Sequence, residues 1–362
     1  MTFKDKKTTL ERKQFILDSI TEYSDRCYDK IVPIKRIMRR PDCASFQLLA
    51  PEELLTLQGS RPEGQLLQRL KVPASYIHRC PDHLQAANVN YWINQHPRQK
   101  LMLRMVKGLA VAPDAEWPAE DYCRAIFSSV YRPIDDKEVF PLAFDALEAA
   151  AAGGNLKDLH IKDWYKERDI TIVRSLYQSR HVDHNDRYYW AGVIVVNSET
   201  GLSAVWIKPT IRTATATAGG FDLSDTSDEG STRLIHTNKA AADLSQITKA
   251  VADALEAAEV GITRLIETET EMIENPARVV EEWVGASDFL SKRIIDIIKD
   301  EYKQQERATK LAVAESILRA VKDLPTFQRY LTEKETGRFL DLFHSTKARI
   351  KKIVKARETD GI

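Results

Sequence analysis

Three segments in the middle of the chain are rich in β-branched and aromatic residues, and polar residues separate them. These segments are DITIVRSLYQS (169–179), YYWAGVIVVNS (188–198) and LSAVWIKPTIRTATATAG (202–219). Such composition is typical of strands, and NSETG (197–201) is short enough to join the last two as a tight hairpin. Further strands are predicted at 44–49, 100–113 and 122–135. The pattern therefore predicts an antiparallel sheet.

Helices are predicted on both sides of these strands in the sequence. In residues 1–30 the apolar positions Phe15, Ile16, Ile20 and Tyr23 recur at helical spacing. The segment 50–58 has Pro51 and two acids where a first helical turn would lie. Other helices are predicted at 64–73, at 82–96 behind an Asp82 N-cap, and at 137–154 before two closing glycines.

The composition changes after His236, where Ala, Leu, Ile, Glu and Lys dominate and Gly and Pro are scarce. Residues 238–273 have the periodicity of one long helix, and Pro276 and Pro325 mark where later helices begin. The long helix has an apolar stripe that needs burial, either on the chain's own sheet or on another copy of the chain. The stripe contains Ile247, Val251, Leu255 and Ile262.

These patterns predict an α+β fold, with an antiparallel sheet and flanking helices followed by an all-helical C-terminal region. The predicted boundaries are an N-terminal helical segment at 1–40, an α+β core domain at 41–237 and a helical region at 238–362. The segment 219–232, rich in Gly, Asp, Ser and Thr, is typical of an exposed connection between the last two.

The formal net charge is zero, with 53 basic and 53 acidic residues. This balance argues against a histone-like coat of nucleic acid, but a local basic surface stays possible because charge distribution matters more than its sum. The first residues lack the apolar core of a secretory signal, and no apolar run reaches the roughly 20 residues that span a bilayer. We therefore expect a soluble, cytoplasmic protein with no membrane partner.

The sequence has no signature of a known enzyme. The four cysteines, Cys27, Cys43, Cys80 and Cys123, form no CxxC pair, so reduced thiols are expected. No segment has the spacing of a phosphate-binding loop or of a nucleophile elbow. We therefore predict no cofactor, identify no small-molecule substrate, and expect a non-catalytic protein rather than an enzyme.

One segment could hold a metal ion. HVDHND (181–186) contains His181, Asp183 and His184, which would suit a metal site or an acid–base site. The segment also lies between two predicted strands, where Asn, Asp and His are common turn residues. The sequence leaves the metal site open beside the turn that we prefer.

Basic and aromatic residues alternate in and around the predicted strands. Arginine and lysine neutralise phosphates and aromatic rings stack on bases, so this mixture suits a single-stranded nucleic acid. The alternative is that the aromatic rings are core and the arginines are surface. The candidate nucleic-acid-binding residues are Arg98, Lys100, Arg104, Arg132, Arg180, Lys208, Arg212 and Tyr189.

One strand face in particular lacks an apolar core stripe. Residues two apart share a face, which places Lys208, Thr210, Arg212 and Ala214 together. We expect this face to meet solvent or a ligand, although an ion pair between subunits would explain it equally well.

Several segments resemble a known family in their residues and in their order along the chain. They are LKVPASYIHRCPDHLQAANVNYWI (70–93), RAIFSSVYRPIDDKEVF (124–140), GVIVVNSETGLSAVWIKPTIRTATATAGG (192–220), RLIHT (233–237) and TKLAVAESILRAVKDLPTFQRYLTEKETGRFL (309–340). Together they resemble the phage/plasmid-like proteins with the domain of unknown function numbered nine-three-two. TAGG (217–220) departs from the family's Cys/Thr-Asn-Gly turn. The resemblance implies a protein of a phage, plasmid or integrated element, placed in the host cytoplasm if phage-encoded.

The predicted function is therefore a non-catalytic, DNA-associated role in recombination or replication. The chain would bind or anneal single-stranded DNA as a homo-oligomer. One alternative is a structural or protein-interaction module that binds a host factor or a virion component. Another is a metal-dependent nuclease that uses His181, Asp183 and His184.

Overall fold

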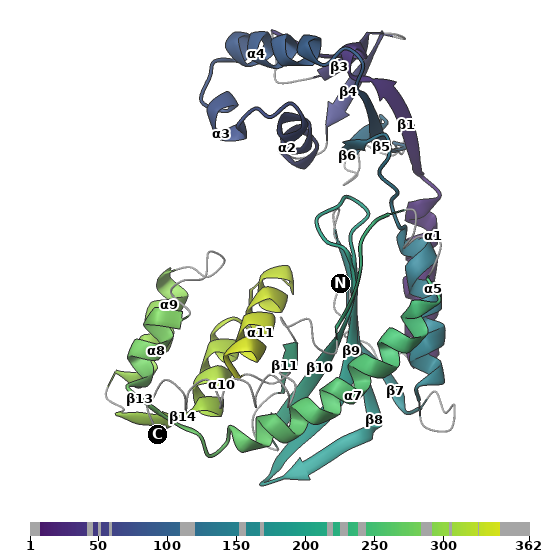
Figure 1. The fold of residues 1–362 in the computed structure, drawn as a ribbon. Helices are drawn as coiled ribbons and strands as arrows, with labels where there is room; N and C mark the ends of the chain where they lie inside the picture. Colours follow the sequence, from purple (N-terminus) through teal and green to yellow (C-terminus); the bar gives the residue numbers. More distant parts are fainter. Residues whose placement is uncertain are drawn as a thin grey trace, which may run out of the picture.

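A computed structural model of the chain shows an α+β protein with two lobes, as the sequence predicted for its fold class (Figure 1). The residues that the structure describes are 8–41, 46–49, 52–57, 60–108, 120–151, 157–166, 170–215, 220–224, 231–237, 244–283, 292–303, 306–324 and 326–340. Among them, no helix has both the length and the apolar character needed to cross a membrane.

The small lobe is a six-stranded sheet with three helices and one 3-10 turn. Its sheet has the order β1-β5-β6-β4-β3-β2, in which β4 and β6 run parallel and the other neighbours run antiparallel. Its own core includes Leu55, Leu66 and Ile126. The elements are β1 (Cys27–Pro33), η1 (Ile34–Arg36), β2 (Ile37–Arg39), β3 (Phe46–Leu49), β4 (Glu52–Leu57), α2 (Ser60–Arg69), α3 (Ala74–Ile77), α4 (Asp82–Gln95), β5 (Lys100–Val106) and β6 (Tyr122–Ser128).

The main lobe contains a second, antiparallel sheet of order β11-β10-β9-β8-β7, with β12 also paired to β10. Its strands are β7 (Leu159–Lys166), β8 (Thr171–His184), β9 (Arg187–Asn197), β10 (Val205–Thr215), β11 (Phe221–Ser224) and β12 (Thr232–Leu234). Its helices are α1 (Thr9–Ser24), α5 (Asp136–Ala149), α7 (Gln246–Glu267), α8 (Pro276–Trp283), α9 (Lys292–Tyr302), α10 (Lys310–Ala320) and α11 (Thr326–Leu340). A separate two-stranded sheet pairs β13 (Met272–Glu274) with β14 (Arg307–Thr309).

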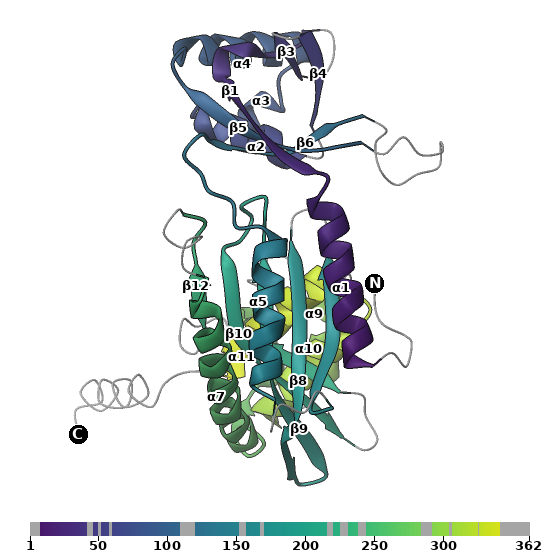
Figure 2. The same cartoon turned by 90° about the vertical axis from the view of Figure 1, so that its right-hand side faces the viewer.

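Helices cover both faces of the main sheet (Figure 2). Helices α1, α5 and α7 bury one face, where Val193, Val195 and Ile211 belong to the largest core. Helix α11 lies on the opposite face, where Tyr330 packs with Ile172 and Ile194. The sheet is therefore the middle layer of three.

The apolar stripe of α7 packs on the chain's own sheet. Ile247, Val251, Leu255 and Ile262 are all buried in the main-lobe core. Of the two alternatives that the sequence left open, burial on the chain's own sheet is therefore the one observed. The stripe offers no free surface to a second copy. Self-association itself stays a prediction.

Two predicted helices are partly or wholly strands. The helix predicted at 1–30 is α1, begun by a Thr8–Glu11 capping box, and the chain then turns into β1, which pairs with β5. The helix predicted at 50–58 is wrong, because its described residues form β4. Leu55 fills the small-lobe core from that strand, and this burial outweighs the local helix-start signal.

Parts of the segment 219–232, which was predicted as an exposed connection, are strands instead. Its two ends form β11 and β12, which both pair with β10, and Asp222 is buried. Residues 225–230 lie outside the described part of the chain. Cores also cross the predicted boundary at 237, because Leu311 of α10 shares the main core with Val193 of the sheet.

Candidate nucleic-acid interface

The strand face predicted to be open is covered. Lys208 is 4% exposed and its ammonium lies 4.1 Å from the ring centre of Trp206. Thr210 is buried and donates its hydroxyl to the carbonyl of Leu223, while Arg212 pairs with Asp222 at 3.1 Å. The expectation of a solvent-facing strand is therefore wrong, because β11 and the C-terminal helices bury this face with partners from the same chain.

The other predicted binding residues do not form one surface. Arg98 and Lys100 are exposed at the start of β5, and Arg132 is exposed beside Glu138. Arg180 pairs with Glu259 on α7, at the far end of β8. Tyr189 is fully buried and donates its hydroxyl to Glu269.

The remaining predicted residue, Arg104, belongs to a buried ionic network where the lobes meet. Its guanidinium pairs with Asp135 and lies 3.5 Å from Asp29 and 3.9 Å from Glu199. Because these carboxylates surround it, Arg104 is not available to an external phosphate.

Glu199, from the NSETG turn between β9 and β10, is the centre of this network. Its Oε2 accepts from Nη1 of Arg124 at 2.8 Å, and its Oε1 accepts from the backbone N–H of Asp136 at 2.8 Å. Burial opposes ionisation of Glu199, but Arg124 and Arg104 outweigh burial and lower its pKa. Burial and then the charge of Glu199 raise the pKa of Asp136 to about 6. The turn is therefore locked into the small lobe by charge.

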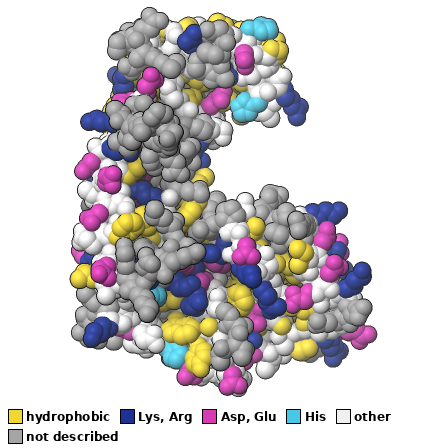
Figure 3. All heavy atoms as spheres, turned by 180° about the vertical axis from the view of Figure 1, so that it is seen from behind, with side chains coloured by type: hydrophobic (Ala, Val, Ile, Leu, Met, Phe, Trp, Pro, Cys, Tyr) yellow, Lys and Arg dark blue, Asp and Glu magenta, His cyan; other side chains and the backbone are white. Residues whose placement is uncertain are grey.

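The same turn forms one wall of a cavity of about 570 Å³ between the lobes, which we call the joint pocket. The carbonyl of Thr200 accepts from Nε of Arg61 at 3.2 Å and from the amide of Gln65 at 2.9 Å, so α2 is fixed to the turn. The molecule is hollowed between the two lobes (Figure 3). The described lining residues are Ser60, Arg61, Gly64, Gln65, Gln68, Arg69, Phe127, Tyr131, Gly201, Ser203, Ala204, Arg233, Ile235 and His236.

The lining of the joint pocket is basic. It contains three arginines, and no Asp or Glu occurs among its described lining residues. Arg69 is half-buried, donates from Nε to the carbonyl of Ile126 at 3.3 Å, and has no carboxylate partner within the described chain. Burial lowers the pKa of Arg69, although an arginine stays charged at neutral pH. The pocket thus holds cationic charge that its own wall does not neutralise.

A column of parallel rings supports this wall. Phe127 and Tyr131 stack at 4.0 Å between ring centres, and His236 lies 5.7 Å beyond Tyr131. Phe127 and His236 are buried, so neither of these two rings offers an open face to a base. Burial lowers the pKa of His236 to about 4, so this ring is neutral at neutral pH and adds no charge.

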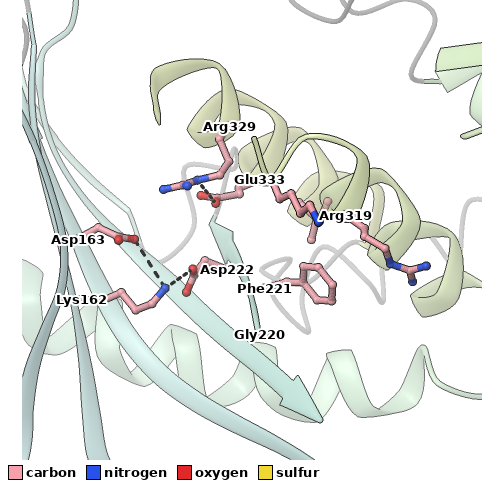
Figure 4. A pocket seen from close by; sticks show the side chains of 10 residues that line it. Lys162, Asp163, Gly220, Phe221, Asp222, Arg319, Arg329 and Glu333 are labelled. Atoms are coloured by element: carbon pink, nitrogen blue, oxygen red, sulfur yellow. Dashed lines mark hydrogen bonds and ion pairs between the residues drawn. The ribbon is translucent and has the colours of Figure 1, made fainter. Parts of the chain in front are cut away.

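A second, strongly charged cavity lies between the main sheet and helices α10 and α11 (Figure 4). Lys162 and Asp163 enter it from β7, Asp222 from β11, and Arg329 and Glu333 from α11. We call it the sheet–helix cavity.

The HVDHND segment forms no converging site in the structure. His181 to His184 continue β8, and only Asn185 and Asp186 form the turn, both with positive φ. Residues three apart on a strand point to opposite faces, which separates His181 from His184. His181 instead lies 2.6 Å from Asp183 and stacks near Trp190. Among the described residues, no group of three or more His, Cys, Asp or Glu is placed to hold a metal ion.

The structure describes three of the four cysteines. Cys27, Cys80 and Cys123 are free, and Cys43 lies outside the described residues.

No protein-family model, curated protein or solved structure matches the chain. The resemblance to the phage/plasmid-like family therefore stays a prediction.

Proposed function

We propose that the chain is a non-catalytic protein that binds single-stranded nucleic acid, and that the joint pocket holds part of its phosphate chain. The observation that carries this proposal is Arg69, a half-buried guanidinium in a pocket whose described lining has no carboxylate. Desolvating a cation without a counter-charge is costly, and a phosphate would supply that charge.

The positions of the other two arginines support the same ligand. Arg61 is oriented by the carbonyl of Thr200, and the exposed Arg233 lies 5.5 Å from the ring centre of Trp206. Guanidinium groups both pair with phosphates and stack on bases, so the pocket does not need an open aromatic face.

The size of the joint pocket favours a single strand. A cavity of about 570 Å³ admits a nucleotide or two, and its walls come from both lobes, which would keep a duplex out. The resemblance to proteins of mobile elements supports DNA as the nucleic acid.

Fluorescence anisotropy with labelled oligo(dT) at several salt concentrations tests the proposal. Arg69→Gln and Arg233→Gln should each weaken binding and reduce the salt slope by about 0.7, the value for one phosphate contact on a single strand. Arg69→Lys should retain most of the slope because it retains the charge.

The control is Arg307→Gln on β14, which removes an equal charge from a side chain that is 66% exposed and is not among the described residues that line the pocket. If Arg69→Gln, Arg233→Gln and Arg307→Gln weaken binding equally, or if the wild-type protein does not bind oligo(dT), the joint pocket is not the interface.

A further inference from the structure

The sheet–helix cavity has a volume of about 430 Å³ and combines charged and apolar walls. Its described lining residues are Lys162, Asp163, Gly220, Phe221, Asp222, Leu318, Arg319, Lys322, Arg329 and Glu333. Figure 4 shows the sheet residues on one side and the helix residues on the other, with Phe221 between them.

The floor of the cavity is a carboxylate surrounded by cations. Asp222 accepts from Lys162 at 2.9 Å and lies 3.2 Å from Arg174 and 3.1 Å from Arg212. Burial opposes ionisation of Asp222, but these three cations outweigh burial and lower its pKa strongly. Asp222 is therefore ionised at any physiological pH, and the surrounding positive charge exceeds its own.

Arg174, beneath the floor, is shared among carboxylates. It pairs with Glu333 and lies 3.1 Å from Asp163, while Arg329 lies 3.4 Å from the second oxygen of Glu333. Burial raises the pKa of Glu333 to about 7, so near neutral pH this carboxyl is charged only part of the time. Partial protonation leaves the cluster more positive than a count of side chains suggests.

The rim adds two exposed cations. Arg319 is 55% exposed and lies 3.4 Å from Glu301, and Lys322 is exposed with no ion pair to another described residue. Six cations, in and beneath the cavity, therefore face four carboxylates when Glu301 is included. At the rim, Arg319 and Lys322 stand against Glu301, so half of this excess lies where a ligand would enter.

We propose that the sheet–helix cavity binds a phosphate monoester of nucleotide size. The phosphate would lie against Arg319 and Lys322 at the rim, because charge-assisted hydrogen bonds are among the strongest that a phosphate makes. Phe221 and Leu318 supply an apolar wall for the ring that the phosphate carries. The volume lies in the range of small-molecule sites. This site is separate from the joint pocket and does not depend on the function proposed there.

Isothermal titration calorimetry of the full chain with dAMP, deoxyadenosine and inorganic phosphate tests the proposal. We expect dAMP to bind, deoxyadenosine not to bind, and inorganic phosphate to compete with dAMP. Arg319→Ala and Lys322→Ala should each weaken dAMP binding about tenfold, as the loss of one charge-assisted contact would.

Both residues are exposed, so their removal should leave the fold intact, and circular dichroism can verify this. Arg307→Ala is the matched control and should leave the affinity for dAMP unchanged. Equal binding of dAMP and deoxyadenosine, the absence of dAMP binding, or an affinity unaffected by the Arg319/Lys322 double variant would overturn the assignment.

Discussion

Replacement of Glu199 is the sharpest test of how the two lobes are joined. Its carboxylate is 2% exposed and is the closest anion to Arg124, at 2.8 Å. In Glu199→Ala, Arg124 would lose this ion pair and would keep, among its contacts, the ring of Tyr23 at 5.0 Å and the sulfur of Cys27 at 3.8 Å. Removing one partner of a buried ion pair costs about 3–5 kcal/mol, because the other charge stays buried.

Arg104 limits this loss, since it retains Asp135 and Asp29. The expected decrease in unfolding free energy is therefore about 3 kcal/mol, at the lower end of that range. Urea denaturation followed by circular dichroism would measure it from the shift of the midpoint. Glu199→Gln should lose a similar amount, because its amide can still accept from Asp136 but cannot neutralise Arg124.

Two controls distinguish the loss of this ion pair from a non-specific loss of stability. Glu259→Ala removes an exposed partner of Arg180 and should cost at most about 1 kcal/mol. Arg124→Met combined with Glu199→Gln removes both charges and should recover most of the stability of the single variant. A loss below about 1 kcal/mol in Glu199→Ala would refute the reasoning, because a buried guanidinium that loses the carboxylate at 2.8 Å should cost more than that.

Further predictions concern helix α11 and the glycines. The pKa of Glu333 is raised from 4.5 to about 7 in the folded state, so its contribution to stability is full below pH 4.5 and is lost as pH rises through 7. The melting temperature should therefore decline less across this pH range in Glu333→Gln than in the wild-type protein. An equal decline in both proteins would contradict the raised pKa. A Cβ at Gly337 would overlap the carbonyl oxygen of Ser224, so Gly337→Ala should destabilise the protein by about 1–3 kcal/mol in urea denaturation. Gly64→Ala in α2 meets open space and should instead stabilise by about 0.5–1 kcal/mol, and equal effects of the two substitutions would refute this contrast.

The strands β8, β9 and β10 were predictable because they consist of long β-branched and aromatic runs, which carry their signal locally. Strand β4 was not, since a proline and two acids favour a helix start and only the packing of Leu55 decides otherwise. The alternation of Lys208 and Arg212 was interpreted correctly as one face. What covers that face comes from β11, through Asp222 and Leu223, and from α11, which packs near Trp206, and local periodicity has no access to such contacts.

The candidate interface was less predictable for the same reason. Arg61 and Arg69 lie on a short helix, and Arg233 directly follows the segment 219–232 that was predicted as an exposed connection. They converge only because the NSETG turn brings the lobes together. The sequence predicts that turn as a hairpin, but no local pattern around Glu199 indicates that its carboxylate is buried between two arginines.

The order of the helices and strands along the chain affects how the protein folds during translation. Helix α1 packs antiparallel on α5, with Lys13 2.7 Å from Glu148, yet the whole small lobe separates the two in sequence. During translation α1 leaves the ribosome before α5, so Ile16 and Ile20 stay uncovered until their partners are synthesised. The small lobe has its own core and can fold in that interval. Biosynthesis thus favours an inserted unit that is complete before the surrounding lobe closes around α1.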